Sequence, residues 1–345
     1  MVATKTSLFA LAVLSVVAKT ASATDYLGGW LQTPPKQQCV DICVNSKATP
    51  TCLTNNPLCL AKKQRPGDFD YLVMESVFVP QFCRDLLKGV DSTISHQNVL
   101  PYPNGIVCKP EVVKSEITIH GLWPNYDDGY AGCCNVSDTI VNRPYNAANF
   151  AKNQAPLLKA MASKWIDPTQ ANEYDTLCEI YNHEFQKHGI CYDANGDNYE
   201  SAAVTYFKAT LNAAAMIEPA VSKINKAAAL STPAIATLAE LEALFSKKVQ
   251  VFCSGVDGTN QLSAIRSCFA KPSVISSAGP STQIDCAPTK PTTTFALCDP
   301  TKPITLLEYT PPGANTPAPT TSVPVPTTVK PVTTPEPTLP AKPSC

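Results

Sequence analysis

Two short segments of this chain gather the side chains best suited to moving protons. Three of its four histidines lie in them: His120 within Ile117–Tyr126, and His183 with His188 within Ile180–Cys191. An imidazole titrates near neutral pH, so it can act as a general base when neutral and as a general acid when charged. Two imidazoles on either side of a phosphate, with a lysine beside them, would form an acid–base site for phosphodiester transfer.

The second segment is expected to place its polar side chains on one side of a helix. At about 100° per residue of an α-helix they project within an arc of about 140°; they are His183, Glu184, Lys187 and His188. Phe185 falls outside this arc and is expected to face the core, and Gly189 is expected to end the helix. A solvated charged face with an incidental histidine pair is the alternative that this segment alone leaves open.

The histidine spacing argues against a metal site. A zinc-protease helix carries its two histidine ligands four residues apart, whereas His183 and His188 are five apart. That spacing would rotate them about 140° from each other on an α-helix. No two cysteines stand in a C-x-x-C arrangement either. We therefore expect neither a metal site nor a cofactor.

His120 belongs to a predicted strand. In Glu116–His120 the alternation puts Ile117 and Ile119 on one face and His120 on the other. A helix that crosses this second face would bring His120 opposite His188, which is the geometry that the phosphodiester chemistry needs.

Other segments must supply the frame for these two motifs. Strands are predicted at Tyr71–Val79 and Val249–Phe252, and helices at Ala147–Lys164, Asn172–Lys187, Ser201–Met216 and Ala236–Ser246. Because strands and helices mix without regular β-α-β alternation, we expect an α+β fold with a central antiparallel sheet flanked by helices.

Composition limits the classes of function. Of the 345 residues 44% are hydrophobic, and the formal net charge is −1. The isoelectric point near 6.4 excludes a protein that grips nucleic acid by bulk positive charge, but not an enzyme that meets RNA at a local site.

The termini indicate a secreted protein. Lys5, the apolar run Leu8–Val17 and the small residues Ala21-Ser22-Ala23 are typical of a secretory signal peptide, residues 1–23. We expect the mature protein outside the cell or in an acidic endomembrane compartment, with no membrane association. The rest of the chain is predicted to comprise a Cys-rich extension (24–65), a catalytic domain (66–305) and a disordered Pro/Thr-rich tail (306–345).

The 15 cysteines indicate a disulfide-rich protein from an oxidising compartment. Fourteen of them could form seven bridges, which leaves Cys345 in the tail as an odd thiol or an intermolecular link. We otherwise expect a monomer. Asn135 begins the one N-glycosylation sequon and is expected in a surface loop.

The segments IHGLWP (from Ile117) and HEFQKHGIC (from His183) resemble the two active-site motifs of the ribonuclease T2 family. The resemblance extends to the DGY-x-x-C run that ends at Cys133, and covers roughly residues 68 to 300. It implies a secreted, metal-independent endoribonuclease of low base specificity. In this family the ribose 2′-OH attacks its own phosphate, giving a 2′,3′-cyclic phosphate that is then opened to a 3′-phosphate.

Residue by residue, the resemblance implies a division of labour. His188 corresponds to the general base and His120 to the general acid. His183 corresponds to the phosphate-binding histidine, and Glu184 with Lys187 to the pair that stabilises the pentacoordinate intermediate. Activity should then be bell-shaped in pH with an acidic optimum, and DNA, which lacks the 2′-OH, should not be cleaved.

Substrate-binding residues are implied less directly. Trp123 corresponds to the stacking residue for the base on the 5′ side of the cut, although core packing is the alternative. Asn125 and Tyr130 lie where family members refine base preference. The family commonly has Gln-Trp in its first strand, whereas Glu75-Ser76 stands at the nearest comparable position here, so preference at the second base site is open.

The resemblance also implies disulfides, and it leaves a second function open. Cys133 or Cys134 should pair with Cys191, and the terminal cysteines should pair among themselves; these are Cys253, Cys268, Cys286 and Cys298. The alternative function is a catalytically inactive secreted protein that binds RNA or a cell wall. An inactive relative would often lose one of the three histidines, and this chain keeps them all.

Overall fold

The computed structural model describes residues 29–31, 38–44, 49–136, 145–194, 198–230, 234–256 and 258–313. The predicted signal peptide, Ser137 of the sequon and the tail from residue 314 with Cys345 lie outside the described residues.

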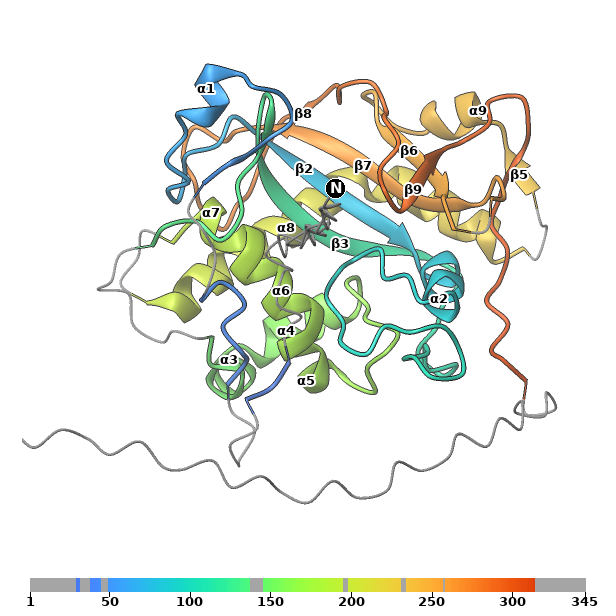
Figure 1. Cartoon of the computed structure of the whole chain (residues 1–345), viewed down its shortest axis with the longest axis horizontal. Coiled ribbons are helices and arrows are strands. Elements are labelled where there is room, and N and C mark those ends of the chain that lie inside the picture. Colours follow the sequence, from blue (N-terminus) through green and yellow to red (C-terminus); the bar gives the residue numbers. More distant parts are fainter. Residues whose placement is uncertain are drawn as a thin grey trace, which may run out of the picture. The chain divides into compact units, whose positions relative to one another are not determined.

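A curled antiparallel sheet forms the centre of the fold (Figure 1). Its strands follow the order β1-β4-β3-β2-β7-β6-β9, with β8 paired to β7. They are β1 (Thr51–Cys52), β2 (Tyr71–Phe78), β3 (Ile117–Tyr126), β4 (Gly129–Tyr130), β6 (Gln250–Ser254), β7 (Leu262–Ala270), β8 (Gln283–Ile284) and β9 (Phe295–Leu297). A second, two-stranded sheet pairs β5 (Ala234–Ala236) with β10 (Ile304–Thr305). The predicted α+β class with an antiparallel sheet is confirmed.

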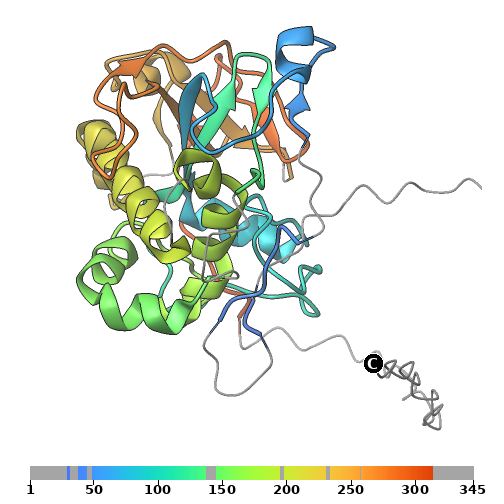
Figure 2. The same ribbon diagram turned by 90° about the vertical axis from the view of Figure 1, so that its left-hand side faces the viewer.

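Helices cover the sheet, and the longest of them, α8, packs along one of its faces (Figure 2). The helices are α1 (Pro57–Leu60), α2 (Val79–Leu87), α3 (Ala147–Asn153), α4 (Ala155–Ala162), α5 (Glu173–Thr176), α6 (Asn182–Glu184), α7 (Ile190–Tyr192), α8 (Tyr199–Ala228) and α9 (Leu238–Glu242). Two π-helical turns, η1 (Leu177–Tyr181) and η2 (Phe185–Gly189), lie between α5 and α7. In the described part of the chain, no helix has the length and apolar character needed to cross a bilayer.

Alternation along the two central strands separates a core face from a site face. Leu72 and Met74 of β2 and Leu122 of β3 are fully buried in one cluster with the aromatic residues of α8. Val73 and Trp123 belong instead to a small cluster on the other face, with Cys268 and Cys286. The period of two thus leaves the face opposite α8 free to carry chemistry.

Several element boundaries differ from the sequence expectation. β3 continues six residues beyond His120, to Tyr126. The helix expected over 147–164 is two helices, because α3 ends before Gln154 and Pro156 stands in the first turn of α4, where a missing N–H costs nothing. The helix expected over 201–216 runs on to Ala228.

Disulfides tie the Cys-rich N-terminal segment to the rest of the fold. Cys39 pairs with Cys178 and Cys43 with Cys133, while Cys52–Cys59 closes a short loop. The described residues up to 311 belong to one compact unit. That unit extends past residue 305, since Leu306 is buried and the Arg84 guanidinium donates to the carbonyls of residues 307 and 308.

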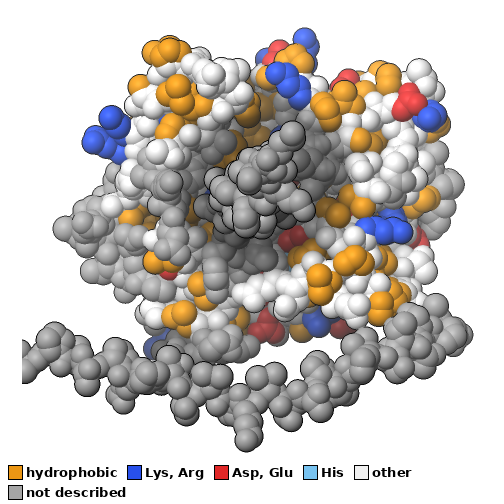
Figure 3. Space-filling view, in the orientation of Figure 1, with side chains coloured by type: hydrophobic (Ala, Val, Ile, Leu, Met, Phe, Trp, Pro, Cys, Tyr) orange, Lys and Arg blue, Asp and Glu red, His pale blue; other side chains and the backbone are white. Residues whose placement is uncertain are grey.

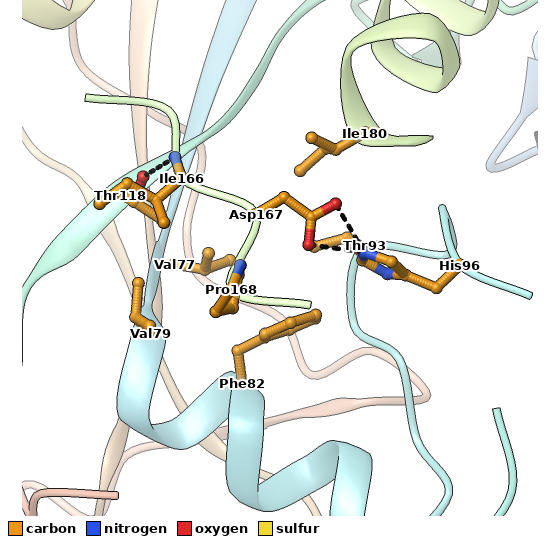
Figure 4. Close-up of a pocket in the computed structure, with 10 residues that line it drawn as sticks. All are labelled: Val77, Val79, Phe82, Thr93, His96, Thr118, Ile166, Asp167, Pro168 and Ile180. Atoms are coloured by element: carbon orange, nitrogen blue, oxygen red, sulfur yellow. Dashed lines mark hydrogen bonds and ion pairs between the residues drawn. The ribbon is translucent and has the colours of Figure 1, made fainter. Parts of the chain in front are cut away.

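The fourth histidine holds a loop to the core (Figure 4). The ring nitrogens of His96 contact Asp91 Oδ2 at 2.9 Å and Asp167 Oδ2 at 3.0 Å. Burial alone would lower the pKa of His96, but the carboxylates of Asp167 and Asp91 outweigh it and raise the pKa well above 6.5. The adjoining cavity of about 10 Å³ has room for about one water molecule, so this clamp is structural.

Candidate active site

A β-bulge in β3 presents His120. Glu75 of β2 pairs with Gly121 and Ser76 pairs with Ile119, which leaves His120 as the extra residue between them. Ile119 and Leu122 consequently both face the core although they are three residues apart. Bulges re-aim side chains in this way, and here the bulge turns His120 away from the core cluster.

Two carboxylates flank the His120 imidazole. Its Nδ1 donates to Glu75 Oε1 at 2.6 Å, and its Nε2 lies 3.1 Å from Glu184 Oε1 in an ion pair. Burial would lower the pKa of His120, but the charges and hydrogen bonds of Glu184 and Glu75 raise it to about 10. The imidazole is therefore charged at neutral pH.

The second motif departs from a regular α-helix. α6 carries His183 and Glu184, and Lys187 and His188 lie in the wider turn η2. The i→i+5 bonding of a π-turn brings residues five apart closer to one side than the 140° expected of an α-helix. The expected helix end at Gly189 is wrong, because α7 continues to Tyr192. Gly189 is needed for packing instead, since a Cβ there would come within 2.7 Å of the Tyr206 ring.

The environment of His188 is the reverse of that around His120. Burial lowers its pKa well below 6.5, and the positive charges of Lys187, His183 and His120 lower it further. Its ring centroid lies 5.2 Å from that of Trp123, and the His120 ring lies 5.0 Å from the same indole. The charged imidazole of His120 and the neutral imidazole of His188 therefore both contact the Trp123 indole.

Glu184 joins the two motifs. Its Oε2 accepts a 2.8 Å hydrogen bond from Trp123 Nε1, while its Oε1 faces His120. Gly121 makes this approach feasible, because a Cβ at that position would overlap Glu184 Oε2.

One disulfide fastens the loop after β4 to the second motif, and another fastens the same loop to the N-terminal segment. Cys134 pairs with Cys191, and Cys133 pairs with Cys43. The Cys133 amide donates to the Lys187 carbonyl at 2.8 Å, and the backbone of Cys133 has a positive φ of 50°. The four terminal cysteines pair as Cys253–Cys298 and Cys268–Cys286.

The residues expected to bind bases lie along the same part of the sheet. Trp123 and Asn125 are half-buried on the site face of β3, and Tyr130 of β4 pairs directly with Asn125. Asn125 Nδ2 donates to the Trp123 carbonyl. His188 and Arg266 already contact the indole, so a base could stack on Trp123 only where they leave a face open.

Sequence reasoning did not identify Glu75 or Arg266 as site residues. Glu75 appeared only as a departure from the family pattern, and Arg266 was not singled out. The signal was present in β2, where Glu75 is the one charged residue in the run YLVMESVF. A carboxylate inside a buried strand needs a charged partner, and Arg266 Nε donates to Glu75 Oε2 at 2.6 Å.

Asn135, the predicted glycosylation site, is exposed, and its side-chain amide donates to the Lys63 carbonyl. Among the described residues, no three His, Cys, Asp or Glu side chains come together in a way that could hold a metal ion. On the face seen in Figure 3, Lys and Arg side chains are scattered rather than gathered into one patch.

Comparisons with known proteins identify the family. The model of the ribonuclease T2 family matches residues 69–286. Ribonuclease 1 of Arabidopsis thaliana is 34% identical over 112 residues, 32% of this chain, and extracellular ribonuclease LE of Solanum lycopersicum is 32% identical over 108 residues, 30% of this chain. The chain spans 40% of the length of each of these relatives.

Solved structures of plant ribonucleases are also similar to this chain. Japanese pear S3-RNase is 19% identical with a TM-score of 0.43, covering 70% of this chain and all of that one. Ribonuclease MC1 from bitter gourd seeds is 20% identical with a TM-score of 0.42, covering 66% of this chain and 99% of that one. Because the family model matches more than half of the sequence, the resemblance is confirmed, and this chain belongs to the ribonuclease T2 family.

Proposed function

We propose that this protein is a secreted endoribonuclease that cleaves single-stranded RNA by transphosphorylation, with two histidines moving the protons and no metal. The observation that carries the proposal is that two imidazoles contact the same Trp123 indole while their surroundings shift their pKa values in opposite directions. Carboxylates raise the pKa of His120 to about 10, whereas burial and neighbouring cations lower the pKa of His188. Paired groups whose pKa values are pushed apart are the usual mark of an acid and a base.

In the first step His188 takes the proton of the ribose 2′-OH as that oxygen attacks the phosphorus. His120 gives its proton to the departing 5′-oxygen, so the P–O5′ bond breaks as the P–O2′ bond forms. In the second step water opens the 2′,3′-cyclic phosphate to a 3′-phosphate, and the two histidines exchange roles.

The other residues of the second motif support the phosphate. Lys187 is a cation beside His188, and it can offset negative charge that builds on the equatorial oxygens. His183 lies in α6, directly before η2, and its charge also acts on His188. Glu184 is engaged by Trp123 and His120, so we assign it to orienting these two side chains as well as to the intermediate.

Substrate choice follows from the nucleophile rather than from bulk charge. A net charge of −1 argues against general electrostatic binding of nucleic acids, and the Lys and Arg side chains on the face seen in Figure 3 are dispersed. RNA supplies its own 2′-OH, whereas DNA does not, so DNA should be inert. Trp123, Asn125 and Tyr130 would contact bases, and stacking on an indole tolerates any base. Family membership and an extracellular relative support secretion. We further propose that residues 1–23 are cleaved, and that the mature protein is a monomer with a Pro/Thr-rich C-terminal tail and a glycan on Asn135.

The test is digestion of total RNA and of single-stranded DNA across pH 4–8 with EDTA present. Wild-type protein should degrade RNA and leave DNA intact, and mass spectrometry should find 2′,3′-cyclic phosphate ends early and 3′-phosphate ends late. His120→Ala and His188→Ala should each abolish the reaction while retaining the wild-type circular dichroism.

The controls separate the alternatives. An RNA carrying a single 2′-deoxy nucleotide should resist cleavage at that position only. Cleavage of DNA, or a strict requirement for metal, would refute the proposal. RNA binding without cleavage would instead identify the catalytically inactive binding protein.

A further inference from the structure

We propose that Glu75 is a positioning residue of this site: its buried carboxylate, backed by Arg266, aims the His120 imidazole and keeps it in the form that donates a proton. The inference rests on the proposed function, since it concerns the residue assigned there as the general acid.

Strand order places Glu75 between its two partners. β2 lies between β3 and β7, and Glu75 pairs with Gly121 on one side and with Arg266 on the other. The bulge lets His120 turn toward this carboxylate. Oε1 then receives the Nδ1 proton at 2.6 Å and Oε2 receives the Arg266 Nε proton at 2.6 Å, so both oxygens are used.

Because Glu75 is buried, its charge destabilises the fold unless both carboxylate oxygens have partners. Glu75 is 0% exposed and His120 is 3% exposed. A buried carboxylate without partners loses several kcal/mol of hydration, and an apolar residue would serve a purely structural strand better. Burial would raise the pKa of Glu75, yet the charges of Arg266 and His120 outweigh it and lower the pKa. The carboxylate is therefore ionised at neutral pH.

Glu75 acts on the side of the imidazole that substrate does not reach. The titratable groups that face His120 are Glu75 from β2, Glu184 from α6 and the neutral His188 from η2, with Arg266 of β7 behind Glu75. The charges of Lys187 and His183 act on His188. Proton donation to a leaving oxygen must use Nε2, which displaces Glu184 from that nitrogen. Glu75 stays on Nδ1 throughout, and holding Nδ1–H fixes both the tautomer and the direction of Nε2.

Arg266, which donates to Glu75, also contacts the ring of Trp123. Its guanidinium carbon lies 5.3 Å from the indole centroid and 4.9 Å from the Phe252 ring. Arg266 of β7 therefore contacts the Trp123 indole directly and reaches His120 through Glu75.

The experiment compares Glu75→Gln with Glu218→Gln, each of which removes one negative charge. Glu218 pairs with Lys164, on the α8 side of the sheet. We measure kcat/KM for a dinucleotide RNA substrate from pH 4 to 10. Glu75→Gln should move the alkaline limb down by about 1–3 pH units, so its deficit grows about tenfold per pH unit above the new limb. Glu218→Gln should follow wild type at every pH.

The imidazole itself provides a readout that needs no activity. The four histidines can be assigned one by one in NMR titrations through His→Ala variants. In wild type the His120 ring should stay charged well above pH 7, and in Glu75→Gln it should lose its proton at lower pH. A wild-type His120 that titrates near pH 6.5, or a folded Glu75→Gln with an unchanged alkaline limb, overturns the inference.

A second variant covers the case in which Glu75→Gln does not fold, and the titration covers the case in which the wild-type protein is inactive. If Glu75→Gln does not fold, Arg266→Gln takes its place, since that side chain is 22% exposed. Removing this cation must leave the alkaline limb where it is or raise it, whereas a lowered limb would overturn the inference. A wild-type protein that fails to cleave RNA refutes the proposed function, while the His120 titration still tests Glu75.

Discussion

The indole of Trp123 donates its Nε1 proton to Oε2 of Glu184 at 2.8 Å, across 61 residues of sequence. This hydrogen bond is a direct link between the strand motif and the helix motif. It holds Glu184 in reach of His120, so the geometry that we propose for catalysis depends on how closely the helix approaches the bulged strand.

Gly121→Ala tests this approach. The new Cβ would overlap Glu184 Oε2 and push the carboxylate away from both Trp123 and His120. A hydrogen bond to a charged group contributes about 1.5–3 kcal/mol, so kcat/KM should fall roughly 10- to 100-fold. Thermal unfolding followed by circular dichroism provides the stability control. Trp123→Phe removes the donor while keeping an aromatic ring, and because both changes break the same hydrogen bond, the double variant should be little worse than the worse single variant.

The pH profile of kcat should be broad, and the protonation of the two histidines determines where activity is lost on each side. The base must be neutral, so activity is lost as pH falls through the lowered pKa of His188. The acid must be charged, so activity is lost as pH rises through the pKa of about 10 at His120. The value of kcat should therefore stay flat from below pH 6.5 to beyond pH 8.

An acidic optimum would then have another origin. At low pH exposed carboxylates take up protons, the protein becomes more positive, and a polyanion binds better. We expect the acidic preference in KM rather than in kcat, with the KM effect weakened by added salt. A kcat that falls on both sides of pH 5 would contradict this assignment.

Local patterns predicted the parts of this fold that obey simple periods. β2 was placed from its apolar and β-branched run, and the antiparallel α+β class followed from the mixture of elements. The bulge at His120 was not predictable, since it depends on Glu75 and Gly121 pairing across strands. The packing role of Gly189 likewise depends on the ring of Tyr206, which belongs to a separate helix, α8.

The other features that the sequence did not predict depend on partners that are distant along the chain. The sequence left Cys133 and Cys134 as equal candidates for Cys191, and the choice depends on Cys43 taking Cys133. Glu75 was seen as a departure, but nothing local indicates that Arg266 lies opposite it. The role of His96 depends on Asp167, 71 residues away.

The disulfide that ties the loop after β4 to the N-terminal segment should matter more than the one that closes a short outer loop. Cys43–Cys133 closes 90 residues of chain and Cys52–Cys59 closes 7. Removing a native bridge typically costs about 2–5 kcal/mol, and more for longer loops. Replacing both cysteines of the first pair by serine should lower the urea midpoint strongly and reduce kcat/KM, because the loop that bonds the Lys187 carbonyl loses one of its two disulfide anchors. The same change at Cys52 and Cys59 should cost less stability and spare kcat/KM; equal effects of the two would contradict this.

His96→Ala should destabilise the protein without changing its chemistry. The variant leaves the buried carboxylates of Asp91 and Asp167 without their shared cation, which should cost about 3–5 kcal/mol in urea unfolding. Adding Asp167→Asn should recover part of that loss, because one unpaired charge is removed. The pKa of His96 is raised in the folded state, so its contribution is full below pH 6.5 and is lost as pH rises through the folded value. Wild-type stability should accordingly decline above pH 6.5 more steeply than that of His96→Ala, and parallel pH dependences would show that His96 is uncharged in this clamp.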